Sequence, residues 1–139
     1  MNNIAQVFKG GKLNHIAVAY HQINPVSAFY KSLGARVSKR VELEEHGVVT
    51  VFVEFENTKI ELLEPLGLKS PISNFLTKNS GGGIHHLCFD VEDLDKSIQE
   101  VEEKKIRLLG PKKIGAHGKP VVFLHPKDCH GLLLELQQK

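Results

Sequence analysis

The sequence predicts an α+β fold made of two modules that share one order of elements, βαβββ. Short segments rich in apolar and β-branched residues are separated by two amphipathic stretches of helical period. These segments follow the same order in both halves of the chain, and a His and a Glu recur in each half at nearly the same spacing. Because a repeated unit fixes the architecture, we expect the two halves to fold alike.

The first module is expected over about residues 13–66. It opens with a strand over 13–20, after which Asn24 is a suitable N-cap, Pro25 fits the first helical turn and Gly34 ends the helix. The apolar residues of this helix recur at i, i+3, i+4 and i+7: Val26, Phe29, Tyr30 and Leu33. The remaining strands of this module are predicted over residues 35–43, 48–55 and 58–63.

The second module is expected over about residues 84–138, after a linker over 67–83. It opens with a strand at Ile84 and continues into a helix capped near Asp93. Its later strands are predicted over residues 106–109, 120–124 and 132–136. The linker carries a short helix near residues 71–78 and a flexible turn at Gly81, Gly82 and Gly83. Residues 1–12 form an N-terminal extension, expected to be a ragged end, with the remnant of a targeting peptide as the alternative.

Size and charge exclude several classes of protein. A chain of 139 residues with 41% hydrophobic content fits a single domain. A net charge of +2 argues against a nucleic-acid partner, and no apolar run approaches the roughly 20 residues that cross a bilayer. Two cysteines do not make a disulfide framework, which favours a reducing compartment.

Four ionisable residues stand out because they occupy matching places in the repeat. His86 follows His15 by 71 positions (86 − 15), and Glu135 follows Glu61 by 74 (135 − 61). Each shares its strand face with largely apolar neighbours, and a buried carboxylate is costly unless a partner such as a divalent cation satisfies it. Taken singly, each has a simpler explanation as a core histidine or an edge glutamate. Together they favour a site for cobalt, manganese, nickel, zinc or iron over calcium.

The other histidines carry less weight. His21, His46, His117, His125 and His130 fall in expected loops and are predicted to lie at the surface. Among these five, His117 is the best candidate for a ligand contact, because its glycine-flanked loop could close over a bound molecule. His85 is expected to face away from His86.

Several segments resemble a known superfamily. The module openings LNHIAVA and GGGIHHLCFDV resemble those of the glyoxalase-like, vicinal-oxygen-chelate superfamily. That resemblance implies a cupped mixed sheet around a metal site. Within the superfamily, residues 12–138 resemble the methylmalonyl-CoA epimerases, through the segments AFYKSLGA, EHGV, NTKIELLEPLG, SPISNFL, KIGAHGKPVVFLHPKD and GLLLELQ.

The resemblance assigns roles to individual residues. It implies metal ligands at His15, Glu61, His86 and Glu135, with Co²⁺ as the expected ion and Mn²⁺, Ni²⁺ or Zn²⁺ as alternatives. Glu135 is also implied as a base acting on the substrate. Thr50 stands where some members carry a second carboxylate, so the opposing acid/base is left unassigned. Our candidates for it are Glu61 or a metal-bound water.

The implied activity is interconversion of (R)- and (S)-methylmalonyl-CoA by a 1,1-proton transfer through an enolate, in the breakdown of propionate, branched-chain amino acids and odd-chain fatty acids. The implied partners are a small acyl-CoA substrate and a second copy of the chain in a homodimer. The implied compartment is the mitochondrial matrix, as for animal-like relatives, or the cytoplasm if the source is bacterial. Lysines near the second module are available for CoA phosphates but are not assigned: Lys112, Lys113, Lys119 and Lys127.

Two alternatives stay open at this stage. One is an enzyme of the lactoylglutathione lyase type, which also moves a proton beside a thioester-like carbon. The other is a metal-free module of the same fold that binds a small molecule, although such a module has no need of both His–Glu pairs. A ring-cleaving dioxygenase normally uses two His and one Glu, so a fourth protein ligand argues against it.

Overall fold

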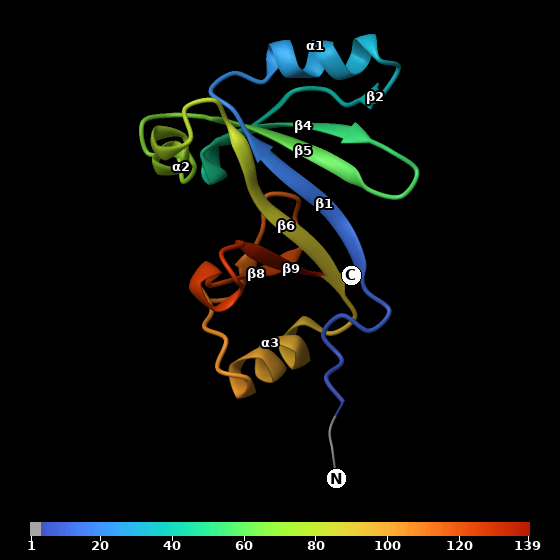
Figure 1. Cartoon of the computed structure of the whole chain (residues 1–139), viewed down its shortest axis with the longest axis vertical. Coiled ribbons are helices and arrows are strands. Elements are labelled where there is room, and N and C mark those ends of the chain that lie inside the picture. The colour runs from blue at the N-terminus through green and yellow to red at the C-terminus, as the bar shows by residue number, and fades with distance from the viewer. Residues whose placement is uncertain (1–3) are drawn as a thin grey trace. The chain divides into compact units, whose positions relative to one another are not determined.

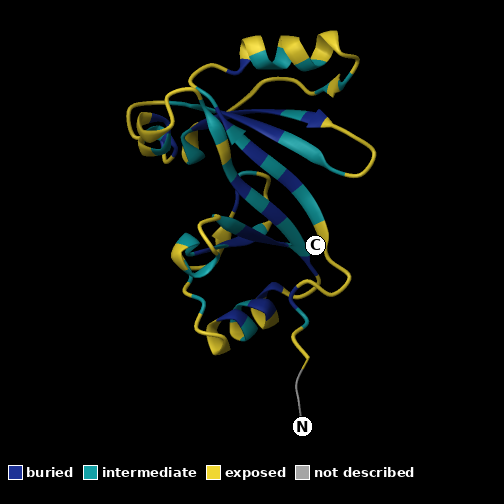
Figure 2. Cartoon of the chain, in the orientation of Figure 1, coloured by how far each residue is buried: buried dark blue, intermediate teal, exposed yellow. Residues whose placement is uncertain are grey.

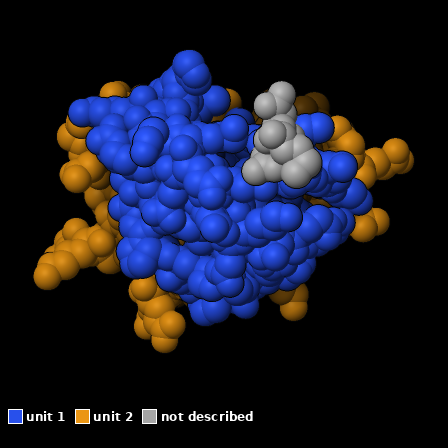
Figure 3. Space-filling model, turned by 90° about the horizontal axis from the view of Figure 1, so that it is seen from below, with its two compact units in different colours: residues 1–14, 86–139 blue, residues 15–85 orange. Residues whose placement is uncertain are grey.

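The computed structural model describes residues 4–139, which form two compact units. One unit comprises residues 15–85, and the other comprises the residues up to 14 together with 86–139 (Figure 3). The boundaries between the units fall inside two long strands, so each of these strands contributes residues to both units.

The elements follow one another along the chain as labelled in Figure 1. In the first half they are β1 (Lys12–Ala19), α1 (Asn24–Ser32), β2 (Arg36–Val37), β3 (Val41–Leu43), the 3₁₀ turn η1 (Glu44–His46), β4 (Val48–Glu54), β5 (Lys59–Pro65) and α2 (Ser73–Lys78). In the second half they are β6 (Gly83–Val91), α3 (Leu94–Glu103), β7 (Lys113–Ile114), β8 (Pro120–Leu124), the 3₁₀ turn η2 (Pro126–Asp128) and β9 (Leu134–Gln138).

The unit of residues 15–85 is a mixed sheet with helices against its faces. Its strand order is β2-β4-β5-β1, with β3 beside β4. Strand β5 runs parallel to β1 and antiparallel to β4. One face packs against α1 through a cluster of Ile23, Val49, Val51, Val53 and Leu62. The other face packs against α2 through Ala17, Ala19, Val48, Leu63, Ile72 and Leu76.

The unit that holds residues 86–139 repeats this plan. Its strand order is β6-β9-β8-β7, with β9 parallel to β6 and antiparallel to β8. Helix α3 covers one face, and the core there consists of Val7, Val91, Leu94, Val101, Val122, Leu124 and Leu136. The side-chain alternation of β1 and β6 is visible as bands of buried and half-buried residues in Figure 2. The predicted α+β class with a mixed sheet is therefore confirmed; the second half has the predicted order βαβββ, and the first half has one strand more.

The start of α1 differs from the prediction. The N-cap is Ile23 rather than Asn24, which is already helical and makes no side-chain cap. The backbone N–H of Ile23 donates to Glu64 Oε1 (2.9 Å), and the Asn24 side chain instead accepts a hydrogen bond from Arg40 (3.0 Å). A carboxylate on β5 thus binds the N-terminal N–H that a neighbouring side chain would otherwise cap. Local sequence does not reveal such a distant partner. Gly34, with φ 89°, follows the helix as expected.

Two predicted strands are wrong in extent. The expected strand over 35–43 is split into the short strands β2 and β3. The expected strand over 106–109 is reduced to one bridge, between Leu108 and Leu124, because the Arg107 backbone and side chain are both bound to Asp128 in η2. The two-residue strand β7 was not predicted. The helix predicted near 71–78, the helix capped by Asp93 and the strand over 120–124 are confirmed.

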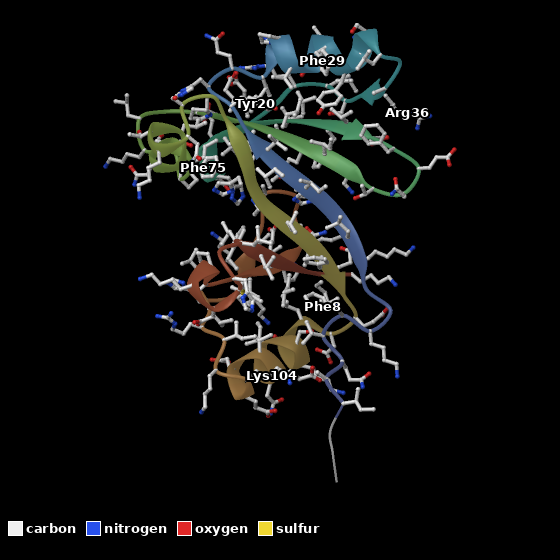
Figure 4. All side chains as sticks on the ribbon, in the orientation of Figure 1. Phe8, Tyr20, Phe29, Arg36, Phe75 and Lys104 are labelled. Atoms are coloured by element: carbon white, nitrogen blue, oxygen red, sulfur yellow. The ribbon has the colours of Figure 1, made fainter. Side chains whose placement is uncertain are left out.

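The N-terminal extension is more ordered than the predicted ragged end. Val7 is buried in the core beside α3, and Phe8, labelled in Figure 4, packs on Phe89 with ring centroids 4.9 Å apart. The backbone N–H of Gln6 donates to Glu100 of α3 (2.8 Å). The prediction of a ragged end is wrong for residues 6–8, whereas residues 1–3 lie outside the described residues. Within residues 4–139, the helices are too short or too polar for any of them to cross a membrane.

Candidate metal centre

The unit of residues 15–85 brings His15 and Glu61 together. Ala17 of β1 pairs in parallel with Glu61 of β5, so Glu61 shares a sheet face with the residue two positions before Ala17, which is His15. The His15 Nε2 lies 3.3 Å from Glu61 Oε1, and both side chains are almost fully buried. We call this pair the first half-site.

The unit that holds residues 86–139 brings His86 and Glu135 together in the same way. Cys88 of β6 pairs in parallel with Glu135 of β9, and His86 again lies two residues before the paired position. The His86 Nε2 lies 3.2 Å from Glu135 Oε1, and both side chains are buried. We call this pair the second half-site. The two half-sites thus have the same register as well as the same residues.

The donor set of each half-site fits a divalent cation. Ligand bonds of about 2.1 Å at angles between a right angle and the tetrahedral angle place neighbouring N and O donors roughly 3.0–3.4 Å apart. Both His–Glu separations, 3.3 and 3.2 Å, fall in that interval. His15, His86 and Glu135 each offer a ligand atom from a buried position. Burying a carboxylate is costly unless a partner satisfies it, and a divalent cation bound by the carboxylate and the imidazole would do so.

An aromatic ring accompanies each half-site. Phe52 of β4 is the cross-strand partner of Glu61, and its ring centroid lies 6.0 Å from that of His15 at 73°. Phe123 of β8 is the cross-strand partner of Glu135, with a centroid distance of 5.4 Å to His86 at 88°. Sequence reasoning missed these phenylalanines, although their spacing of 71 positions (123 − 52) equals that of the histidines.

The half-sites differ in the polar groups beside them. Asp90 and Gln137 are paired neighbours on β6 and β9, and Gln137 Nε2 donates to Asp90 Oδ1 (3.4 Å). Asn14 Nδ2 contacts both Asp90 carboxylate oxygens at 3.2 Å. In the other unit the corresponding paired residues are Ala19 and Leu63. The second half-site therefore has hydrogen-bonded polar residues beside it, whereas the first half-site has apolar residues at the corresponding positions.

Thr50 lies on the same sheet face as Glu61. It is buried in β4, pairs with Leu63 and is two residues before Phe52. A threonine hydroxyl does not ionise near neutral pH, so Thr50 cannot act as the second carboxylate of some family members. Glu61 is the carboxyl group that lies beside His15 on this face.

The remaining histidines lie outside the half-sites. His21, His117 and His130 are exposed as predicted, whereas His46 and His125 are half-buried. His125 Nδ1 accepts the backbone N–H of Lys127 (3.1 Å), so its role is to cap η2. The ring of His85 packs on Phe75 of α2, with centroids 5.1 Å apart.

Comparison with known proteins identifies the family of this chain. Residues 14–123 match the model of the Glyoxalase/Bleomycin resistance protein/Dioxygenase superfamily. The chain is 54% identical to the mitochondrial methylmalonyl-CoA epimerase of Homo sapiens over 134 residues, which is 95% of this chain and 76% of that protein. The chain belongs to the methylmalonyl-CoA epimerases of this superfamily.

Two further methylmalonyl-CoA epimerases extend the comparison. The ethylmalonyl-CoA/methylmalonyl-CoA epimerase of Cereibacter sphaeroides is 50% identical, with 92% of this chain and 98% of that protein covered. A methylmalonyl-CoA epimerase solved in complex with methylmalonyl-CoA and NH4+ is 32% identical and has a TM-score of 0.83, with 92% of this chain and 94% of that chain covered. The predicted fold family and the enzyme class are thereby confirmed. The assignment of individual ligands stays a prediction.

Proposed function

We propose that this chain interconverts (R)- and (S)-methylmalonyl-CoA by moving a proton at C2 of the malonyl group. The observation that carries the proposal is the pair of equivalent, buried His–Glu half-sites in a chain of the methylmalonyl-CoA epimerase family. The relative solved with methylmalonyl-CoA supports an acyl-CoA substrate. The role in propionate, branched-chain amino acid and odd-chain fatty acid breakdown follows from that substrate.

His15, Glu61, His86 and Glu135 would together hold one divalent cation. Co²⁺ is the proposed ion, as the family resemblance implies, with Mn²⁺, Ni²⁺ and Zn²⁺ as alternatives; two imidazoles and two carboxyl groups suit all four. The bound cation supplies an electrophile that stabilises the negative charge developing on the substrate oxygens. Superfamily membership and the chemistry of the half-sites support the metal, and the identity of the ion is part of the proposal.

The two glutamates account for the proton movements. The C2 proton is acidified by the thioester and carboxylate carbonyls that flank it. The carboxylate of Glu135 takes this proton from one face of C2, and the electron pair passes into the adjoining carbonyl to give an enolate. Glu61, which is protonated at the start of this step, then gives its proton to the opposite face and becomes a carboxylate, which inverts the centre. Catalysis in the reverse direction uses the two groups in opposite roles.

Burial of the half-sites favours this chemistry. Glu61 and Glu135 are 3% and 8% exposed, so few water molecules compete with the substrate for their carboxyl groups. Low water content also strengthens the electrostatic interaction between a cation and developing negative charge. Val49 and Leu62 pack on the opposite face of the β4–β5 pair and hold the strand that carries Glu61 in place.

The Cereibacter sphaeroides relative, named for ethylmalonyl-CoA as well as methylmalonyl-CoA, supports a second substrate. We propose that ethylmalonyl-CoA is also epimerised, because the reacting carbon is the same and only one methylene is added. Comparing kcat/KM for the two thioesters tests this. A pocket that rejects the extra methylene by steric clash would give no turnover of ethylmalonyl-CoA.

A homodimer is the proposed assembly, and the mitochondrial matrix or, for a bacterial source, the cytoplasm is the proposed compartment. The mitochondrial animal relatives and the bacterial relative support both compartments. Light scattering coupled to size-exclusion chromatography measures the mass against the 15.5 kDa of one chain. A mass of one chain at micromolar concentration would contradict the dimer.

Two assays separate the proposed function from its alternatives. Methylglyoxal with glutathione should give no product, whereas turnover of that pair would favour a lactoylglutathione lyase. Titration of metal-stripped protein with Co²⁺ should saturate at one ion per chain. A protein that binds its small molecule equally well without a cation would instead be a metal-free binding module.

A further inference from the structure

We propose that Phe52 and Phe123 are positioning residues, each of which fixes the ring plane of one ligand histidine. Each phenylalanine lies directly opposite the ligand glutamate in strand register, so its ring projects from the same sheet face as the His–Glu pair. This inference rests on the proposed metal-dependent function. It assigns a task to two residues that do not themselves bind the ion.

The ring geometry supports this task. The imidazoles of His15 and His86 meet Phe52 and Phe123 at 73° and 88°, which is the edge-to-face arrangement that aromatic pairs prefer. Rotation of an imidazole about its side-chain bonds would break this contact and would also move Nε2 away from the neighbouring carboxylate. One ring contact therefore selects the orientation in which Nε2 lies 3.2–3.3 Å from the glutamate oxygen.

Core packing does not account for the two phenylalanines. Both are half-buried, and neither belongs to the buried hydrophobic clusters found among residues 4–139. Their strand neighbours Val51 and Val53 in one case, and Val122 and Leu124 in the other, supply the core from the opposite face. The phenyl rings instead lie on the face that carries the His–Glu pairs, where the ring neighbours described for them are a ligand histidine and a lysine.

A lysine ammonium lies over each phenyl ring. Lys59 Nζ lies 5.6 Å from the centroid of Phe52, and Lys113 Nζ lies 5.6 Å from that of Phe123. The two lysines come from non-equivalent places, since Lys59 is on β5 and Lys113 is on β7. In both units, a lysine ammonium, a phenyl ring, an imidazole and a carboxylate thus follow one another in space. The lysine comes from a different strand in each unit. Such recurrence favours a shared requirement over chance packing.

The test measures metal binding and does not depend on activity. Phe52→Leu and Phe123→Leu keep an apolar side chain but remove the ring. We expect each to weaken Co²⁺ binding roughly 10-fold, in the range found for residues that orient metal ligands, and to alter the visible absorption spectrum of bound Co²⁺. Phe52→Tyr retains the ring and should keep wild-type affinity and spectrum. Chelator competition gives the affinities, and thermal unfolding of metal-free protein reports the stability change.

Phe75→Leu is the matched control. Phe75, labelled on α2 in Figure 4, makes the same kind of edge contact with His85, a histidine outside the half-sites. This control should lower stability but leave Co²⁺ affinity unchanged. Unchanged binding and spectrum in both leucine variants, or an equal loss in Phe75→Leu, would overturn the inference while leaving the proposed function standing. A wild-type protein that binds no Co²⁺ would overturn both.

Discussion

Glu61 and Thr50 are the two residues that bear on the second acid/base of the proposed reaction. Both are buried on the same face of the β4–β5 pair, yet only the glutamate can exchange a proton near neutral pH. The resemblance alone left the second acid/base unassigned because Thr50 replaces the carboxylate of some family members. The position of Glu61 beside His15 makes it the residue that we assign to this task.

Glu61→Gln tests this assignment. The amide keeps the shape and one oxygen donor but cannot deliver an acidic proton, so we expect the epimerisation rate to fall roughly 10²- to 10⁴-fold at saturating Co²⁺. Thr50→Val, on the same face, should change the rate less than about 3-fold. Rates are followed by circular dichroism of the thioester, with metal content measured in parallel. Full turnover by fully metal-loaded Glu61→Gln would exclude Glu61 as the acid/base.

At the element scale, the sequence predicted best those segments that local signals determine. Asp93 caps α3 by accepting the Lys96 backbone N–H, as its position in the sequence indicated. The predictions failed where a distant partner decides the outcome. Glu64 on β5 accepts the backbone N–H of Ile23, so α1 starts one residue earlier than predicted. Asp128 accepts the backbone N–H of Arg107, so the segment over 106–109 does not form the expected strand. Local sequence carries no signal for either partner.

The Arg107–Asp128 pair should contribute a pH-dependent stability. Hydrogen bonds from the Arg107 side chain and then from its backbone N–H lower the pKa of Asp128 from 3.8 to about 2. A lowered pKa in the folded state stabilises the fold above pH 3.8, and this contribution is lost as the pH falls toward 2. The stability difference between wild type and Asp128→Asn should therefore shrink over that interval. Urea unfolding at several pH values measures it, and a difference that does not change with pH would contradict the account.

The N-terminal segment gives a second prediction at this scale. Val7 is buried against the core beside α3, whereas Ile4 in the same segment is 79% exposed. Val7→Ala removes two buried methyl-sized groups and should lower the free energy of unfolding by about 1.5 kcal/mol. Ile4→Ala should change it by less than about 0.5 kcal/mol. Equal effects of the two substitutions would show that Val7 does not stabilise the fold.

At the scale of the whole molecule, the internal repeat was the sequence feature that best predicted the fold and the two His–Glu pairs. The spacings of 71 and 74 positions anticipated two half-sites of equal register, and the structure has both. Strand alternation and the repeat match Ala19 with Asp90 and Leu63 with Gln137, so the sequence indicates a difference beside the two half-sites, whereas the pairing of these residues across the strands comes from the structure. Strand register, which local patterns do not determine, is needed to establish that pairing.

Metal binding should stabilise the whole molecule if the residues of both half-sites bind the same ion. An ion at a concentration of about 100 times its Kd adds about 2.7 kcal/mol to the free energy of unfolding. For a chain of 139 residues this corresponds to a rise in Tm of roughly 8 °C. His86→Ala should abolish the rise, whereas His117→Ala, at an exposed loop, should retain it. A rise of equal size in both variants would contradict the proposed ligand set.

Proton exchange at C2 of methylmalonyl-CoA in D₂O tests the central claim most directly. Chelator-stripped protein should incorporate no deuterium, and added Co²⁺ should start the exchange. Glu135→Gln should not exchange the epimer whose C2 proton faces Glu135, even with metal bound. That pattern is the result we predict from the two His–Glu half-sites. Absence of exchange with every divalent cation tried, or exchange of that epimer in Glu135→Gln at the wild-type rate, would contradict it.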